Sequence, residues 1–315
     1  MTMKKTLSMF FVLLVCFCFS SVAYADVAPC FKVNYYDEEN YPHSIDSNET
    51  PQFEAVVPDE NNPDSNIENI TLGTPVTADH SEFTVPITLP TYTKTGEYEY
   101  SITQKPGSTA GVEYDEGPIV FRVLVRYNDA GNIAVIDTGA GFSGENKKAS
   151  FTNIFHSGTL SVTNTVSGTD ADRNIPFEIT VAFTAPDGQN ISEPISYIIK
   201  DANGTKIDEK TIGGSGNAKT VKINLRHGNT ATFNNVPAGV NYTVTQATLG
   251  GFNAPVYESN SGSITAGQSA SASVTNNAIL SLNTGVLFQN TGALVILVIA
   301  VVGILLLLFR RKRKD

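Results

Sequence analysis

Apolar and polar residues alternate with a period of two in short runs along residues 27–278 of the chain. This alternation is typical of half-buried β-strands, whose successive side chains point to opposite faces of a sheet. Turn sequences such as Pro186-Asp187-Gly188 and Ala202-Asn203-Gly204 separate the runs. Short strands at this spacing predict an all-β fold built of β-sandwiches. The clearest predicted strands span residues 83–87, 98–103, 120–127, 177–183 and 242–245.

Two sequences with strong backbone preferences refine this prediction. Pro86 lies inside the first of these strands. Because proline has no N–H to donate to a neighbouring strand, residues 83–87 are predicted to form an edge strand. The run Gly213-Gly214-Ser215-Gly216 predicts a flexible hairpin tip over residues 212–217.

The chain divides into two similar halves. Residues 96–104 and 238–246 both end in the sequence Tyr-x-x-Thr-Gln, and each half closes on a strand that ends in Thr-Asn, at Asn153 and at Asn276. A repeat of one module is the economical interpretation. The boundary lies within residues 153–158, so the predicted domains span residues 26–156 and 157–278.

The N-terminus has the features of a secretory signal peptide. Lys4 and Lys5 form a charged region, residues 7–19 form a short apolar core, and Ala23-Tyr24-Ala25 is a small-x-small cleavage site. Residues 1–25 are therefore predicted to be removed by cleavage between Ala25 and Asp26.

The C-terminus has the features of a membrane anchor. Residues 293–309 carry no charge and are followed by a basic run from Arg310 to Lys314. This order predicts a stalk at 279–290, one transmembrane helix at 291–309 and a cytoplasmic tail at 310–315. The predicted location is the extracellular side of the cell membrane or the cell wall, with the membrane as a partner of the single span.

The charge distribution excludes one class of partner. The chain has a formal net charge of −10, although five of its 21 Lys and Arg residues form the C-terminal run 310–314. Nucleic-acid binding needs clustered Lys and Arg to contact phosphates, and the domains offer none. The chain is therefore not expected to bind nucleic acid.

Residues that could carry chemistry are sparse and scattered. Cys30 is the only cysteine that follows the predicted signal peptide, so no intramolecular disulfide is expected. No Ser/His/Asp or Cys/His arrangement and no nucleotide-binding motif stands out. The sequence therefore predicts that the protein is not an enzyme and has no cofactor or metal site. The four histidines lie far apart in the sequence, at His43, His80, His156 and His227.

Several segments resemble one family. The segment Gly158-Thr159-Leu160-Ser161-Val162-Thr163-Asn164 resembles the opening strand of Gram-positive, streptococcal backbone-pilin domains of the isopeptide-linkage type. Residues 235–245 resemble the strand that precedes the catalytic position of this family, and residues 96–104 and 151–153 match the same pattern in the first half. The resemblance implies two tandem Ig-like/CnaB-like β-sandwiches. It also implies a cell-surface structural role as a pilin-like spacer, a scaffold or a minor pilus component, with pilus subunits as partners.

The same resemblance implies a cross-linking site in each domain. In this family, a Lys on the first strand attacks the side-chain amide of an Asn on the last strand, and a buried Glu transfers the protons. The attack needs a neutral amine and a protonated carboxyl group, both of which burial favours. In the second domain, the matching positions hold Asn164 in place of Lys, Gln246 in place of Glu, and Asn276 as the acceptor.

In the first domain, Gln104 and Asn153 fill the Glu and acceptor positions. The Lys position falls on Asn34 or, one residue later, on Tyr35, while Lys32 lies two residues away. An amide is not a nucleophile and Gln has no proton to relay, so neither domain is predicted to form the isopeptide bond. The amides are predicted to hydrogen-bond across each sandwich instead, the alternative being that these residues are ordinary polar strand positions.

The signals for anchoring and polymerisation depart from the family pattern. Leu282-Asn283-Thr284-Gly285 resembles a sortase sorting motif but lacks its Pro. Cleavage by sortase and retention of the membrane anchor both stay open. Lys147-Lys148 lies where related pilins carry the acceptor lysine for the next subunit, and a solvated loop pair is the alternative interpretation.

A second function is compatible with the sequence. Residues 37–69 of the first domain form a long segment with little strand pattern. Loops of an all-β scaffold often carry binding sites. The alternative function is therefore a surface adhesin that binds a host or glycan ligand through this domain.

Overall fold

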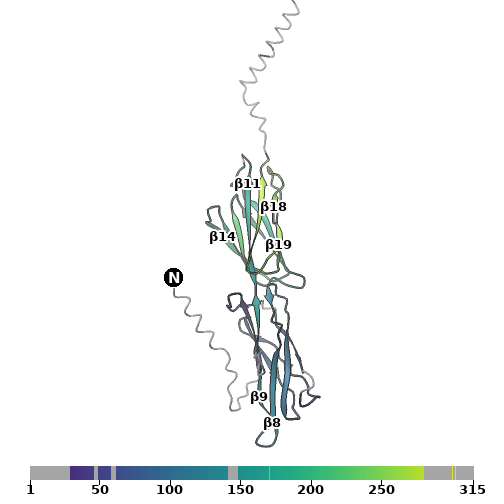
Figure 1. The fold of residues 1–315 in the computed structure, drawn as a ribbon. Helices are drawn as coiled ribbons and strands as arrows, with labels where there is room; N and C mark the ends of the chain where they lie inside the picture. Colours follow the sequence, from purple (N-terminus) through teal and green to yellow (C-terminus); the bar gives the residue numbers. More distant parts are fainter. Residues whose placement is uncertain are drawn as a thin grey trace, which may run out of the picture.

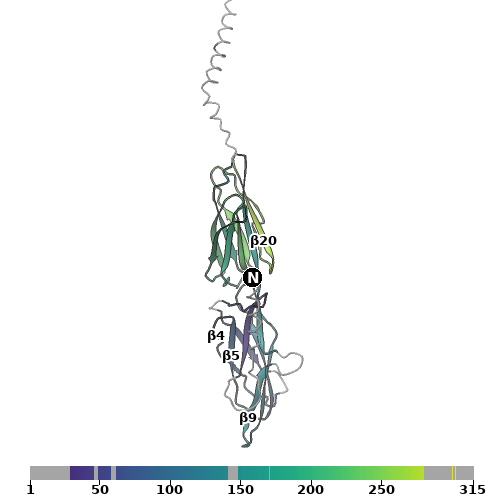
Figure 2. The ribbon, with the colours of Figure 1, turned by 90° about the vertical axis from the view of Figure 1, so that its left-hand side faces the viewer.

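The computed structural model describes residues 29–45, 49–57, 62–140, 148–169 and 171–279, together with residues 300 and 302. The described chain is built of β-strands that form two β-sandwiches placed end to end (Figure 1). The two sandwiches stay in line when the molecule is turned by 90° (Figure 2). The all-β prediction is confirmed.

The predictions for both ends of the chain fall outside the described residues. They concern the signal peptide at 1–25, the sorting motif at 282–285, and all of the predicted membrane helix except residues 300 and 302. Among the residues that the structure describes, no helix is both long and apolar enough to cross a membrane.

The first domain consists of two sheets that enclose an aromatic core. The core includes the fully buried side chains of Tyr35, Tyr98, Tyr100 and Phe121. One sheet has the strand order β3 (Thr71–Leu72), β5 (Glu82–Thr88), β1 (Cys30–Asp37), β10 (Ser150–Phe155) and β7 (Val112–Glu113), with β4 (Val76–Thr77) also paired to β5. The other sheet has the order β2 (Gln52–Val56), β6 (Gly96–Lys105), β8 (Ile119–Tyr127) and β9 (Ile133–Ala140).

The second domain repeats this plan with a more aliphatic core, which includes Leu160, Val162, Ile179 and Val244. One sheet has the order β14 (Lys206–Ile212), β13 (Ile195–Lys200), β16 (Thr230–Pro237), β11 (Ser157–Ser167), β20 (Ser269–Asn277) and β18 (Val256–Glu258). The other has the order β15 (Ala218–Leu225), β12 (Phe177–Thr184), β17 (Asn241–Gln246) and β19 (Ser261–Ser263).

The first and last strands of each domain are parallel neighbours. Strand β1 pairs with β10, and β11 pairs with β20. Parallel strands cannot be joined by a tight turn, so the rest of each domain forms the connection between them. This topology places residues from the two ends of each domain side by side on the inner face of one sheet.

The prediction that Pro86 marks an edge strand is wrong. Strand β5 lies inside its sheet, between β1 on one side and the short strands β3 and β4 on the other. Pro86 lies opposite the gap between β3 and β4, where the amide of Gly73 donates to the Pro86 carbonyl at 2.8 Å. The neighbouring chain therefore leaves the sheet where proline has no N–H to offer.

The glycine-rich segment 212–217 is not a hairpin tip. It links β14 to β15, which belong to opposite sheets of the second domain. The carbonyls of Gly216 and Asn217 accept hydrogen bonds from the amides of Ile191 and Ala185 at 2.7 and 2.8 Å. These bonds fix the crossing between the sheets.

Candidate functional site

Three amide side chains meet between the sheets of the second domain. Asn164 on β11 and Asn276 on β20 are fully buried, and Gln246 ends β17 in the opposite sheet. Asn276 Nδ2 donates to Asn164 Oδ1 at 2.9 Å, and Gln246 Nε2 donates to Asn276 Oδ1 at 2.6 Å. The structure therefore brings together the three positions that the family resemblance selected in this domain.

This amide cluster, Asn164, Gln246 and Asn276, satisfies its own polar groups. Asn276 Nδ2 also lies 3.2 Å from Gln246 Oε1, and Asn164 Nδ2 donates to the Leu225 carbonyl at 2.9 Å. Each side chain in it is both a donor and an acceptor, and none carries a charge. The cluster links the first strand, the last strand and the opposite sheet, but it contains neither an amine to attack an amide nor an acid to move a proton.

In the first domain, Tyr35 rather than Asn34 faces the interior. Burial alternates along β1, with Phe31, Val33 and Tyr35 buried. Tyr35 lies opposite Asn153 on β10, whereas Asn34 is half-buried on the other face and lies opposite Thr152. Of the two alternatives at the Lys position, the structure therefore selects Tyr35, and Asn34 is not part of the buried group.

Lys32 is also directed away from this site. It lies on the same face of β1 as Asn34, because the two are two positions apart along the strand. Its Nζ lies 2.8 Å from Glu82 Oε1 in a partly exposed ion pair on the neighbouring strand β5. The described geometry therefore does not bring the amine of Lys32 to the amide of Asn153.

Tyr35, Gln104 and Asn153 form the first-domain counterpart of the amide cluster. All three are buried. Burial raises the pKa of the Tyr35 hydroxyl, the charge of Glu49 raises it further, and the nearby amides of Asn153 and Gln104 lower it in part. The net pKa lies well above the ordinary value for tyrosine, so the phenol is neutral at physiological pH.

The first-domain group is joined less tightly than the amide cluster. Asn153 Oδ1 accepts the backbone amide of Asp115 at 2.9 Å. Within the described part of the chain, the Tyr35 hydroxyl, the Asn153 Nδ2 and the Gln104 amide make no hydrogen bond of normal geometry. Polar contact in this group is therefore weaker than in the second domain.

Glu49, which no sequence pattern indicated, lies beside this group. Its carboxylate accepts a hydrogen bond from the Tyr114 hydroxyl at 2.6 Å and one from the Thr109 hydroxyl. Glu49 precedes β2, outside any strand pattern, so no periodic signal pointed to it. Its charge acts on the Tyr35 hydroxyl and raises the pKa of that group.

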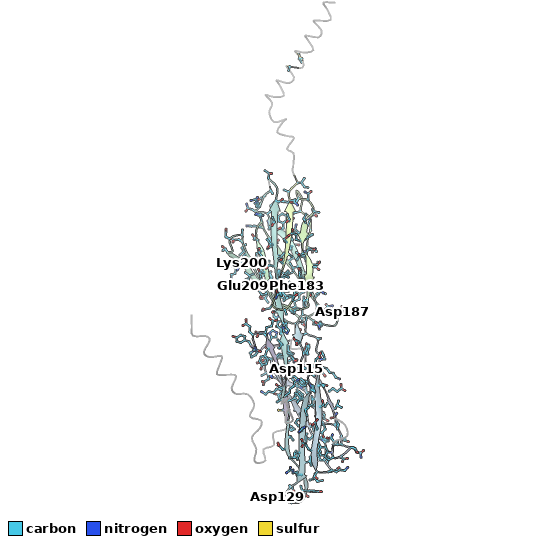
Figure 3. All side chains as sticks on the ribbon, in the orientation of Figure 1. Asp115, Asp129, Phe183, Asp187, Lys200 and Glu209 are labelled. Carbon is cyan, nitrogen blue, oxygen red and sulfur yellow. The ribbon has the colours of Figure 1, made fainter. Side chains whose placement is uncertain are left out.

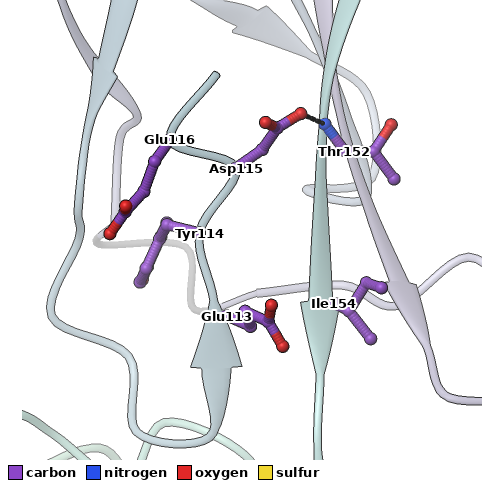
Figure 4. A pocket seen from close by; sticks show the side chains of 6 residues that line it. All are labelled: Glu113, Tyr114, Asp115, Glu116, Thr152 and Ile154. Atoms are coloured by element: carbon purple, nitrogen blue, oxygen red, sulfur yellow. Dashed lines mark hydrogen bonds between the residues drawn. The ribbon is translucent and has the colours of Figure 1, made fainter.

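Lys148 is held in place rather than solvated. Its Nζ lies 2.6 Å from Asp115 Oδ1 and 4.5 Å from the centre of the Phe151 ring. Asp115 also accepts the backbone amide of Thr152 at 3.0 Å, in an acidic groove beside β7 and β10 (Figure 4). Burial alone would raise the pKa of Asp115, but hydrogen bonds from Lys148, Thr152 and Gly117 lower it overall. Lys147, the other half of the predicted pair, lies outside the described residues.

Comparison with known proteins connects this geometry to a family. Residues 33–156 match the Spy0128-like isopeptide containing domain, and residues 158–278 match a domain of unknown function, DUF7601. A pilin from Streptococcus pyogenes serotype M1 is 28% identical over 165 residues. The chain is pilin-like. This bears out the resemblance that the sequence indicated.

The matches cover different shares of the pilin-like chain and of its relatives. The alignment to the curated pilin covers 50% of this chain and 46% of the pilin, so it spans about half the length of each. The crystal structure of the major pilin from S. pyogenes matches 80% of this chain and 98% of its own, with 19% identity and a TM-score of 0.55. The T-13 major pilin of the same species matches with 16% identity and a TM-score of 0.52. These structures show that the tandem sandwich fold is shared.

Proposed function

We propose that this pilin-like chain is a cell-surface structural protein that serves as a spacer, a scaffold or a minor pilus component. The tandem sandwich fold and the match to the isopeptide-containing domain support this role. Two sandwiches placed end to end give an extended shape suited to holding a surface structure away from the cell (Figure 1). The predicted signal peptide and C-terminal anchor would place it outside the membrane.

The observation that carries the proposal is that, among the described residues, neither internal site brings a lysine amine to its acceptor amide. An isopeptide bond needs the ε-amine of a lysine beside the acceptor amide, and a carboxylic acid to move the protons. Asn276 is in contact with Asn164 and Gln246, and Asn153 lies opposite Tyr35. We propose that both domains are held by side-chain packing and hydrogen bonds, without a covalent bond between their first and last strands.

We infer a non-enzymatic role, and the family resemblance indicates the partners. Pilus subunits and a sortase are the expected partners at the cell surface, and the membrane is the expected partner of the C-terminal segment. The adhesin alternative gains no support from the fold. The first residues of the segment 37–69 lie at the junction with the second domain, where Glu38 contacts His156.

The location and assembly can be tested on cells that express the full chain. We expect an antibody against the second domain to label intact cells, and protease added outside to remove the label. Wall extracts run under denaturing conditions then distinguish the roles. A single species supports an unpolymerised spacer or scaffold, and a ladder of covalent multimers supports a pilus component. Recovery of the protein only from the cytoplasm would contradict the proposal.

A further inference from the structure

The junction between the domains centres on a single residue, His156. It is the one residue between β10, which ends at Phe155, and β11, which begins at Ser157. Its backbone amide donates to the carbonyl of Gly111 in the first domain at 2.8 Å, and its carbonyl accepts the amide of Ala238 in the second domain at 2.9 Å. The backbone of His156 is therefore bonded to both sandwiches.

A loop of the first domain is also joined to the second. The amide of Ala110 donates to the Asn190 carbonyl at 2.9 Å, and the amide of Asn190 donates to the Ser108 carbonyl at 2.8 Å. Ala110 is fully buried in the hydrophobic core of the second domain. The junction thus has backbone bonds and apolar packing that can hold the sandwiches in line.

The side chain of His156 lies between two carboxylates. Its Nδ1 is 2.8 Å from Glu38 Oε1, and its Nε2 is 3.0 Å from Glu113 Oε2. A neutral imidazole carries only one N–H, so both contacts can be hydrogen bonds only when the ring is doubly protonated. Burial alone would lower the pKa of His156, but the hydrogen bonds and charges of Glu38 and Glu113 raise it above its ordinary value.

The loop that carries Glu38 continues into a contact between the domains. His43 stacks on Phe155 with ring centres 4.1 Å apart, and its Nε2 lies 3.6 Å from Glu193 Oε1 of the second domain. Other charged groups of the described residues at this junction include Asp37 and Glu39, which line the same cleft as His43 and Glu193. Glu49 accepts the Thr109 hydroxyl in the loop that pairs with Asn190, and Lys219 Nζ donates to the Glu193 carbonyl at 2.9 Å. Carboxylates outnumber cations here, so loss of the His156 charge leaves them in mutual repulsion.

We propose that doubly protonated His156 locks the domain junction, and that loss of one ring proton frees the two sandwiches to bend relative to one another. The protonated ring holds Glu38 and Glu113 against the linking residue. This contact keeps the loop from Asp37 to His43 in place against Glu193. When the ring is neutral, one carboxylate faces a lone pair, and the hydrogen bonds that cross the junction open more often. The rod is then stiffer in acid than in base.

Hydrogen–deuterium exchange on the full chain tests this proposal without an attached probe. The chain and its His156→Gln variant are compared at the same pH, so that the intrinsic exchange rate cancels. We expect peptides that contain Ala110, Asn190 and Ala238 to exchange roughly threefold faster in the variant at about pH 6. A change of this size corresponds to the small free energy of a partly exposed ion pair. The difference should fall as the pH is raised toward about 9, because the native ring then loses its second proton. Peptides from β8 and β12 should exchange equally in both.

His227→Gln is the matched control. His227 Nδ1 accepts the amide of Val166 within the second domain, away from the junction, so its loss should leave exchange at Ala238 unchanged. Glu113→Gln is a second, milder variant that removes one of the two carboxylates beside His156. In this variant the faster exchange of the junction peptides should begin at a lower pH than in the native chain. Equal exchange of the chain and its His156→Gln variant at about pH 6 would overturn the proposal, and so would a difference that persists unchanged at about pH 9.

Discussion

Tyr35 and Asn153 lie opposite each other on the parallel strands β1 and β10, and both are fully buried. Asn164 and Asn276 hold the equivalent strands β11 and β20 together in the second domain. Both sites hold the positions that the family resemblance assigns to the isopeptide bond. The two domains therefore fill one structural position in two ways, with an aromatic hydroxyl in one and an amide cluster in the other.

Asn276→Ala should destabilise the second domain strongly. The substitution removes the partner of Asn164 Oδ1 and both contacts to Gln246, and it leaves the buried Asn164 oxygen and the half-buried Gln246 amide unsatisfied. We expect a loss of about 3 kcal/mol in the free energy of unfolding. Differential scanning calorimetry measures it. Asn277→Ala, which removes only a partly exposed contact to Ser167, is the matched control. An equal loss in both variants would show that the amide cluster has no special role.

Tyr35→Phe should change the stability of the first domain little, by less than about 0.5 kcal/mol. The Tyr35 hydroxyl is buried and makes no hydrogen bond of normal geometry to another described residue, so its removal costs no good bond. The ring, which packs against Phe83 with centres 6.0 Å apart, stays in place. Tyr35→Ala provides the contrast, since it also removes the ring. A loss for Tyr35→Phe as large as that for Asn276→Ala would mean that the hydroxyl supports the first domain.

The family chemistry should be recoverable in the second domain. The double variant Asn164→Lys, Gln246→Glu places an amine beside the Asn276 amide and an acid across from it, in a site that burial makes suitable for both neutral forms. We expect the intact mass of this variant to lie one ammonia below the mass calculated from its sequence. The peptide map should show residues 164 and 276 joined. Adding Asn276→Ala to the double variant should abolish the deficit. A full mass for the double variant would show that the alignment of these positions with the family is wrong.

Asp115 should make the first domain sensitive to acid. Its pKa in the folded state is lowered overall by Lys148 and by the amides of Thr152 and Gly117. Its stabilising contribution is therefore present above its pKa in the unfolded chain and is lost as the pH falls through the lowered value. Unfolding by urea, followed between about pH 2 and pH 6, should show a smaller fall in stability for Asp115→Asn than for the native chain. Asp129→Asn is the control, because Asp129 lies exposed at the outer end of this domain (Figure 3). Parallel curves for all three chains would contradict the assignment.

The strands and their inward faces could be predicted because burial leaves a period of two in the sequence. The predicted runs at 98–103 and 177–183 became β6 and β12 for this reason. The face of β1 on which Asn34 lies is harder to predict, because a slip of one residue along the strand moves a side chain to the other face of the sheet. Only the register of Tyr35 with Asn153 decides between the two.

Features that depend on distant parts of the chain left no local signal. Pro86 predicts an edge strand, and nothing in the sequence shows that the neighbouring chain instead leaves the sheet opposite it. Glu49 and His156 lie outside the strand pattern and acquire their partners only when the domains form. The three amides of the second domain were found through the family resemblance, since a polar residue at a buried strand position carries no label of its own.

We expect neither sandwich to carry a covalent bond between its first and last strands. The intact mass of residues 26–285, compared with the mass calculated from the sequence, tests it directly. We predict agreement within the error of the spectrum. A deficit of one ammonia would contradict the claim for one domain, and a deficit of two would contradict it for both. Peptide mapping would then locate the lysine that had reached Asn153 or Asn276.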